Sequence, residues 1–207
     1  MCFFNRNIDS NREGVDFMFE VLGVAFIVTF FALTIGAIIV KMLGGTNILV
    51  LGKKDKSELL FGLGYFILLY TILSNATALP MPEIINRFFW YSDICRIAGI
   101  VFSGLGIIGY IVCTISFWKS IRIGVDYENA GDLTTTGIYA FSRNPMYTSF
   151  YILFFGEFLI FPNIGLLVSL IVAGVSFHLQ ILKEEKFLKS HYGKYYEDYC
   201  KKVRRYF

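Results

Sequence analysis

The residues of this chain with the clearest chemical potential lie on either side of an apolar segment. An Arg-Asn-Pro-Met-Tyr run at residues 143–147 precedes it, and a Glu-Glu pair at residues 184–185 follows it. The apolar segment is interrupted at Pro162-Asn163, where proline disrupts helical hydrogen bonding and the chain can turn back. A tight helical hairpin would bring Arg143 and the two acids to the same end, where pairing or a hydrated pocket lowers the cost of charges near hydrocarbon. This arrangement predicts a polar site at one end of a membrane hairpin.

The composition indicates that the elements carrying these residues lie in a bilayer. Hydrophobic residues make up 56% of the 207 residues and charged residues 17%. Because ~20 apolar residues span a hydrocarbon core, we expect an all-α integral membrane protein with about five transmembrane helices. The expected spans are residues 17–40, 59–79, 97–118, 147–161 and 164–182. The fourth is short, and the fourth and fifth form the tight helical hairpin.

The chain is expected to form a single membrane domain with three regions. Residues 1–16 are a polar N-terminal tail, residues 17–118 hold three transmembrane helices, and residues 119–207 hold the candidate site. The third region begins with a loop containing Gly, Thr and acidic residues and continues through the hairpin. Its fifth helix is expected to continue as a cytoplasmic, amphipathic C-terminal helix rich in Lys and Tyr, which could lie on anionic headgroups, cover a site, or do both.

Basic residues predict the orientation in the membrane. Of the 19 Lys and Arg residues, 15 fall on the side that carries residues 143–147 and the C-terminus. The positive-inside rule therefore places this side in the cytoplasm and the N-terminus outside. The net charge of +3 reflects this topology, and no nucleic-acid partner is inferred from it. The membrane would be the plasma membrane in a prokaryote and the endoplasmic reticulum in a eukaryote.

The pattern Gly104-x-Gly106-x-x-Gly109 matches the dinucleotide-binding fingerprint but lacks the structural context that this fingerprint requires. That fingerprint needs a preceding strand and a helix N-terminus that receives phosphate, whereas these glycines lie within an apolar span. Gly99 with Ser103, and Gly106 and Gly109 nearby, are more typical of close helix packing. The four cysteines have no paired spacing, so free thiols and no metal site are expected.

Glu157 is an acid about ten residues into the fourth expected span. Ionisable residues inside a membrane often mark a functional site. Glu157 could take part in proton transfer, or it could be a structural residue that faces Asn163 or a water-filled crevice. Both interpretations are open.

The order of these motifs resembles the C-terminal half of the isoprenylcysteine carboxyl methyltransferase and phospholipid methyltransferase family. The family signature is an Arg-His-Pro-x-Tyr block, a hydrophobic span and a Glu-Glu pair, and the resemblance covers roughly residues 118–204, with Asn144 in place of the His. It implies an integral membrane methyltransferase that uses S-adenosyl-L-methionine at the cytoplasmic face. The implied cofactor-binding residues are Gly131, Asp132, Leu133, Thr134, Tyr139, Asn144, Pro145, Met146, Tyr147 and Glu184.

The residue types at these implied positions suit such a methyl donor. Main-chain groups of the loop can hydrogen-bond adenine, and Pro145 fixes the start of a helix whose N-terminus favours the methionine carboxylate. Glu184 can hold an ammonium group or a ribose hydroxyl. The rings of Tyr139 and Tyr147 can pack on the adenine or the sulfonium.

The acceptor side of the expected site lies on the same helix as the Glu pair. In prenylcysteine enzymes of the family an Arg about one turn before the pair engages the substrate carboxylate; here that place is Gln180, with His178 nearby. A neutral amide binds a carboxylate less well than a bidentate guanidinium, so we expect a different lipid-like acceptor. Methyl transfer mostly needs alignment and exclusion of water. Arg143 could orient an anionic acceptor and Glu185 or Glu157 could deprotonate an amine, so these three are the candidate catalytic residues.

Two other classes of function remain alternatives. A sterol-reductase-like membrane enzyme would use NADPH on a related C-terminal helical architecture, although such chains are typically much longer. A non-enzymatic membrane scaffold would share the fold of these enzymes without their activity. The expected partners are membrane lipids and a hydrophobic or lipid-like methyl acceptor, and the sequence does not indicate an oligomeric state.

Overall fold

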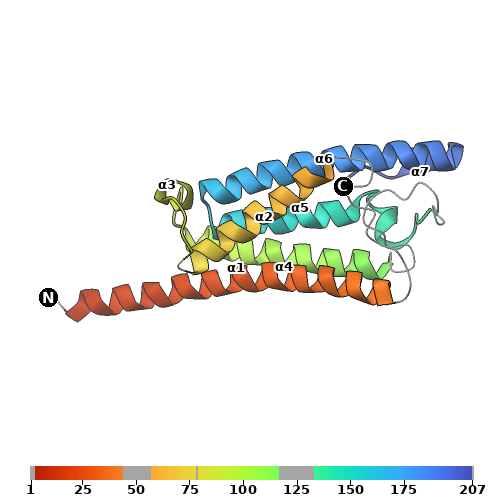
Figure 1. The fold of residues 1–207 in the computed structure, drawn as a ribbon. Coiled ribbons are helices and arrows are strands. Elements are labelled where there is room, and N and C mark those ends of the chain that lie inside the picture. The colour runs from red at the N-terminus through yellow and green to blue at the C-terminus, as the bar shows by residue number, and fades with distance from the viewer. Residues whose placement is uncertain (1–2, 44–56, 78, 117–132, 207) are drawn as a thin grey trace.

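The computed structural model describes residues 3–43, 57–77, 79–116 and 133–206, which form a bundle of helices (Figure 1). In chain order the helices are α1 (Phe3–Leu43), α2 (Ser57–Ala76), α3 (Glu83–Asn86), α4 (Asp93–Ser116), the 3-10 helix η2 (Gly137–Ala140), α5 (Pro145–Ile160), α6 (Ile164–Tyr192) and α7 (Lys194–Lys202). The described ranges contain isolated β-bridges and no strand. The predicted all-α fold class is confirmed.

The five long helices lie side by side, and the short helices and turns lie at the two ends of the bundle (Figure 1). One end carries η2, the start of α5, the end of α6, and α7; we call it the motif end, after residues 143–147 and 184–185. The opposite end carries α3, the N-terminal part of α1 and the turn between α5 and α6; we call it the turn end, after residues 161–163.

Several helices are suited to a bilayer by length and composition. Gly14–Val40 within α1, Asp93–Ser116 and Ile164–Tyr192 are each long and apolar enough to cross it, whereas Leu63–Asn75 and Pro145–Ile160 are shorter apolar helices. At 1.5 Å per residue, the 16 residues of α5 reach about 24 Å, less than a hydrocarbon core of about 30 Å. The helices support a multi-pass membrane protein, while the model of five spans stays a prediction.

Both ends of the described chain differ from the expected element boundaries. α1 begins at Phe3 and so includes most of the polar segment at residues 1–16. Asp16 on α1 forms an ion pair with Arg96 on α4, whose guanidinium also lies 4.6 Å from the ring centre of Phe19. At the other end, α6 does not continue as one helix: Gly193 has φ of 52°, which glycine adopts without strain, and α7 turns back from it.

Close packing of α4 on α5 explains the glycine pattern on α4. A Cβ atom at Gly106 would lie 2.7 Å from the main-chain nitrogen of Leu153, and one at Gly99 would lie 2.7 Å from the carbonyl oxygen of Gly156. Only glycine permits this approach of two helices. The packing interpretation is therefore confirmed for Gly99 and Gly106.

An aromatic cluster joins the five long helices. Phe30 on α1 stacks on Tyr65 on α2 at 5.8 Å between ring centres, and it lies 5.2 Å from Tyr110 on α4. Phe150 on α5 is 5.3 Å from Phe30 and 5.5 Å from Phe177 on α6. These aromatic contacts hold the five helices in fixed positions relative to one another.

The predicted hairpin of two helices is present in α5 and α6. α5 ends at Ile160, and α6 begins after Asn163, whose buried side-chain oxygen accepts a hydrogen bond of 2.9 Å from the main-chain nitrogen of Leu166. Asn163 is thus the N-cap of α6. Because the two helices run in opposite directions from this turn, the start of α5 and the end of α6 meet at the motif end.

Candidate active site

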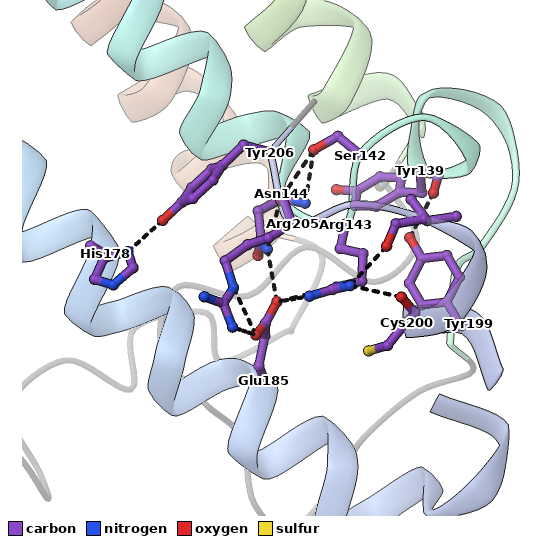
Figure 2. Close-up of polar contacts among 11 residues, drawn as sticks. Tyr139, Ser142, Arg143, Asn144, His178, Glu185, Tyr199, Cys200, Arg205 and Tyr206 are labelled. Atoms are coloured by element: carbon purple, nitrogen blue, oxygen red, sulfur yellow. Dashed lines mark hydrogen bonds and ion pairs between the residues drawn. The ribbon is translucent and has the colours of Figure 1, made fainter. Parts of the chain in front are cut away.

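The motif end brings together three segments that are far apart in the sequence. The loop before α5 contributes Ser142, Arg143 and Asn144, α6 contributes the acids, and the chain after α7 returns over both (Figure 2). Main-chain pairing anchors this return, since the nitrogen of Arg143 donates to the carbonyl oxygen of Arg204 at 2.9 Å. The site is therefore assembled by the hairpin and closed by the C-terminal segment.

Glu185 lies at the centre of an ionic cluster that we call the Glu185 cluster: Arg143, Asn144, Glu185 and Arg205. Arg143 donates to Oε1 of Glu185 from Nε at 3.2 Å and from Nη2 at 2.9 Å. Arg205 donates to Oε2 from Nε at 3.0 Å and from Nη2 at 2.7 Å. The expected charge pair between Arg143 and the Glu pair is present, and a second arginine completes it. Forked bonds of this kind restrict the carboxylate in both position and orientation.

Arg143 has a second set of partners at the end of α7. Its Nη1 donates to the carbonyl oxygens of Cys200 at 3.2 Å and Val203 at 2.7 Å, which satisfies carbonyls that the helix leaves unpaired. Burial lowers the pKa of Arg143, but the hydrogen bonds and charge of Glu185 outweigh this, so its pKa is raised. Arg143 is therefore a permanently charged residue that connects three segments.

Asn144 keeps a hydrogen-bonding role at the position where the family signature has His. It precedes α5 as the N-cap residue, but its side chain does not cap the helix. Its Nδ2 instead donates to the carbonyl oxygen of Arg205 at 3.2 Å and to Glu185 at 3.4 Å. The first main-chain hydrogen bond of α5 runs from the nitrogen of Thr148 to the carbonyl oxygen of Asn144 at 3.1 Å. The N–H groups of Met146 and Tyr147 come before this bond, so they point out of the N-terminus of the helix.

Glu184 faces a different set of partners, which we call the Glu184 triad: Tyr147, Gln180 and Glu184. The Tyr147 hydroxyl donates to Oε1 of Glu184 at 2.8 Å, and Nε2 of Gln180 donates to the same oxygen at 3.0 Å. Oε2 has no hydrogen-bond partner among the described residues. One carboxylate oxygen is thus fixed by two helices and the other is available to a ligand.

Tyrosines of η2 and α7 form the wall on the loop side. The Tyr199 hydroxyl donates to the carbonyl oxygen of Tyr139 at 2.6 Å, and Tyr196, Tyr199 and Val203 pack around Leu133. Burial raises the pKa of Tyr199 to about 12, and burial followed by the nearby Cys113 and Glu184 raises that of Tyr139. Both phenols stay neutral at physiological pH, so they offer rings and hydrogen bonds rather than a base.

The remaining candidates are placed as follows. His178 lies apart from the Glu184 triad, and its Nδ1 is hydrogen-bonded to the hydroxyl of Tyr206 (Figure 2). Glu157 lies toward the turn end of α5, fully buried, where it accepts a 3.0 Å hydrogen bond from Ser103 on α4. The structure does not bring Glu157 to the motif end.

The loop before η2 is described only in part. Gly131 and Asp132 lie outside the described residues. Leu133 and Thr134 are partly exposed, and the main-chain groups of residues 133–135 have no hydrogen-bond partner within the described ranges. This short extended segment can therefore offer main-chain donors and acceptors to a ligand.

Sequence analysis missed the contribution of the segment after α7. Arg205 and Tyr206 contact Glu185 and His178, and neither was among the candidates. The available signal was Gly193, a typical residue for the position just after a helix, which indicates that the chain can reverse there.

Comparisons with known proteins agree with this geometry. The sequence model of the phospholipid methyltransferase family matches residues 94–195, from α4 to the start of α7. Two rice proteins, from the indica and japonica subspecies of Oryza sativa, are 29% identical to the chain over 136 residues, which is 65% of this chain and 70% of each relative; both are named "Probable protein-S-isoprenylcysteine O-methyltransferase". The "Protein-S-isoprenylcysteine O-methyltransferase" of Schizosaccharomyces pombe is 39% identical over 72 residues, which is 34% of this chain and 30% of that protein.

These matches support a membrane methyltransferase. The chain is similar to the family that includes the isoprenylcysteine carboxyl methyltransferases and the phospholipid methyltransferases. The matched segment contains the Glu185 cluster apart from Arg205 and the whole Glu184 triad.

Proposed function

We propose that this protein transfers a methyl group from S-adenosylmethionine to an amphipathic or lipid-like acceptor. The observation that carries the proposal is the Glu184 triad, in which Tyr147 and Gln180 hold one oxygen of Glu184 and leave the other available beside the start of α5. Similarity to the phospholipid methyltransferase family model supports the reaction, and the relatives' names support a lipid-linked setting.

The residues present fit the chemical groups of this donor. Oε2 of Glu184 can accept from an ammonium or a ribose hydroxyl. The first N–H groups of α5, at Met146 and Tyr147, together with the helix dipole favour a carboxylate. Main-chain groups at residues 133–135 suit the edge of a base, and the ring of Tyr139 follows shortly after them on η2. One site thus offers partners for an anion, a cation and an aromatic ring.

The donor, when bound, supplies a methyl group on a positively charged sulfur. The acceptor atom forms a bond to the methyl carbon as the carbon–sulfur bond breaks, and the electron pair stays on the sulfur, which becomes a neutral thioether. The chain's task is to align the two partners and to keep water out. Tyr147 and Gln180 align Glu184, and the aromatic wall of Tyr139 and Tyr199 limits access from the loop side.

The Glu185 cluster has a supporting role in this proposal. Each oxygen of Glu185 already accepts two hydrogen bonds from a guanidinium, so Glu185 is poorly placed to remove a proton. Arg143 in turn is engaged with Glu185 and with the carbonyls that end α7. We therefore assign both residues to holding the site together, and not to proton transfer or acceptor orientation.

The acceptor reaches the site from the bilayer in this proposal. α6 carries Gln180 and Glu184 of the triad and is itself long and apolar enough to cross a membrane. Gln180 is bonded to Glu184 and offers no charge to a carboxylate, which favours an acceptor whose reacting group is not a carboxylate.

The motif end faces the cytoplasm in this proposal, on the basis of the positive-inside rule. Labelling of single cysteines in a cysteine-free background, with a reagent that does not cross membranes, tests the topology. Cys200 should be labelled only after the inner face is opened, and a cysteine placed at Asn11 should be labelled from outside. Labelling of both positions from one side would contradict five spans.

Titration calorimetry of the purified protein in detergent tests the donor. We expect heat of binding with S-adenosylmethionine and with its demethylated product, S-adenosylhomocysteine, and none with NADPH. Binding of NADPH alone would favour the reductase-like alternative. Binding of none of the three would favour the scaffold and would contradict the proposal.

A further inference from the structure

The segment that follows α7, residues 203–206, lies across the motif end as a strap. It runs back along α6, with Tyr206 against His178 and Arg205 against Glu185 (Figure 2). It also runs beside the loop before α5, where Ser142 and Arg204 form a parallel β-bridge. The strap is therefore in contact with both helices that carry the Glu184 triad.

Arg205 is the residue of the strap that binds both helices at once. Its carbonyl oxygen accepts from Nδ2 of Asn144 at 3.2 Å and from the hydroxyl of Ser142 at 3.4 Å, next to the start of α5. Its guanidinium donates two bonds to Glu185 on α6. Because Tyr147 comes from α5 and Glu184 from α6, the separation of these two helices at the motif end sets the geometry of the triad.

Neighbouring Arg204 provides an internal contrast. Its side chain is exposed and forms no hydrogen bond or ion pair within the described ranges. The side chain of Arg205 is 36% exposed and that of its partner Glu185 is 12% exposed. Two adjacent residues of equal charge thus differ in whether their side chains contact the site.

We propose that Arg205 is a positioning residue for the methyl donor: by clamping Oε2 of Glu185 to the start of α5, it holds Glu184 and Tyr147 at the spacing that the donor needs. This inference rests on the proposed function, because it assigns the donor to the Glu184 triad. Arg205 touches neither the donor nor the acceptor in this scheme, and its effect passes through Glu185.

The test compares Arg205→Gln with Arg204→Gln in the full-length protein in detergent. Each substitution removes one positive charge from the same surface. The measured quantities are the Kd for S-adenosylhomocysteine and the melting temperature without ligand. Couplings carried through such networks are typically about 0.5–2 kcal/mol, so Arg205→Gln should weaken binding roughly threefold to thirtyfold and Arg204→Gln should leave it unchanged.

Two further variants separate positioning from a general loss of structure. Arg205→Lys keeps the charge and should recover part of the affinity. In a Glu185→Gln background, Arg205→Gln should cause little further loss, because the contact through which it acts is already weakened. Arg205 would be merely structural if Arg205→Gln lowered the melting temperature, Arg205→Lys recovered no affinity, and the effects of Arg205→Gln and Glu185→Gln on the Kd were additive.

The outcomes distinguish this inference from the proposed function. If Glu184→Gln weakens binding while Arg205→Gln and Arg204→Gln give equal affinities, the strap inference is overturned and the donor site stands. If the unmodified protein does not bind S-adenosylhomocysteine, or if Glu184→Gln leaves its Kd unchanged, the donor assignment fails and this inference fails with it.

Discussion

The two ends of the α5–α6 hairpin hold their acidic residues in opposite ways. At the turn end, Glu157 is fully buried, accepts a hydrogen bond from Ser103, and has an Oε2 atom without a partner among the described residues. At the motif end, Glu185 is bound by two arginines and Glu184 keeps one oxygen available. One helix pair therefore contains an acid enclosed by packing and two acids embedded in a polar network.

The two kinds of acid differ in their surroundings. Around Glu157, the glycines allow close contact: a Cβ at Gly23 would lie 3.2 Å from its Oε2, and a Cβ at Gly156 would lie 2.4 Å from the Ser103 hydroxyl. Buried polar groups in such close-packed regions serve mainly to hold helices together. We therefore propose that ligand chemistry takes place at the motif end, where loops and helix termini supply unpaired groups.

The largest effect should follow from breaking the network at the motif end. Arg143→Ala removes two bonds to Glu185 and two to the end of α7, and it leaves Glu185 with Arg205 as its remaining arginine. Removing one partner of a largely buried ion pair costs roughly 3–5 kcal/mol, so we expect a loss near the lower end of that range, because Arg205 remains. Denaturant unfolding in detergent measures it. A change below about 0.5 kcal/mol would show that the cluster does not hold α7 in place.

A smaller effect is expected from disturbing the packing on which the turn end depends. Gly106→Ala would place a Cβ 2.7 Å from the main chain of Leu153, whereas Gly104→Ala would meet only Phe26, at 3.9 Å. Overpacking costs about 1–3 kcal/mol, so Gly106→Ala should lower stability and Gly104→Ala should not. Neither should change the Kd for S-adenosylhomocysteine at temperatures where the variants are folded. Equal stability of the two variants would contradict the packing account.

Much of the helical hairpin could be predicted because its signals are local. Apolar length located the helices, and Pro162-Asn163 located the turn. The pairing of Arg143 with the Glu pair followed from the hairpin itself, since antiparallel helices bring their open ends together.

The strap could not be predicted because its contacts join distant residues. The spacing of Tyr196, Tyr199 and Val203 is compatible with a continuous helix, and only their burial against Leu133 distinguishes a helix that turns back. The choice depends on bonds such as that from Arg143 to the carbonyl oxygen of Val203, which are 60 residues apart. Likewise, α1 begins at Phe3, and its residue Asp16 forms an ion pair with Arg96, which is 80 residues away in the sequence.

The smallest expected effect concerns which acceptor the protein methylates. This prediction tests the role of Gln180 at the motif end and does not test the donor site. We expect weak methylation of a farnesyl-cysteine analogue by the unmodified protein and better activity on a lipid amine or an alkyl thiol. Gln180→Arg should raise prenylcysteine activity severalfold, because a guanidinium forms bidentate bonds to a carboxylate. Transfer of labelled methyl in reconstituted membranes measures this. Robust prenylcysteine methylation by the unmodified protein would show that Gln180 is no barrier.

The most direct test makes the same substitution at both ends of the hairpin. Glu184→Gln and Glu157→Gln each replace a carboxylate with an amide, and the Kd for S-adenosylhomocysteine is measured by calorimetry in detergent. A charge-assisted hydrogen bond is worth about 1.5–3 kcal/mol, so Glu184→Gln should weaken binding on the order of tenfold to a hundredfold, while Glu157→Gln should leave the Kd unchanged. An unchanged Kd for Glu184→Gln, or an equal loss at Glu157, would contradict the assignment of the donor to the motif end.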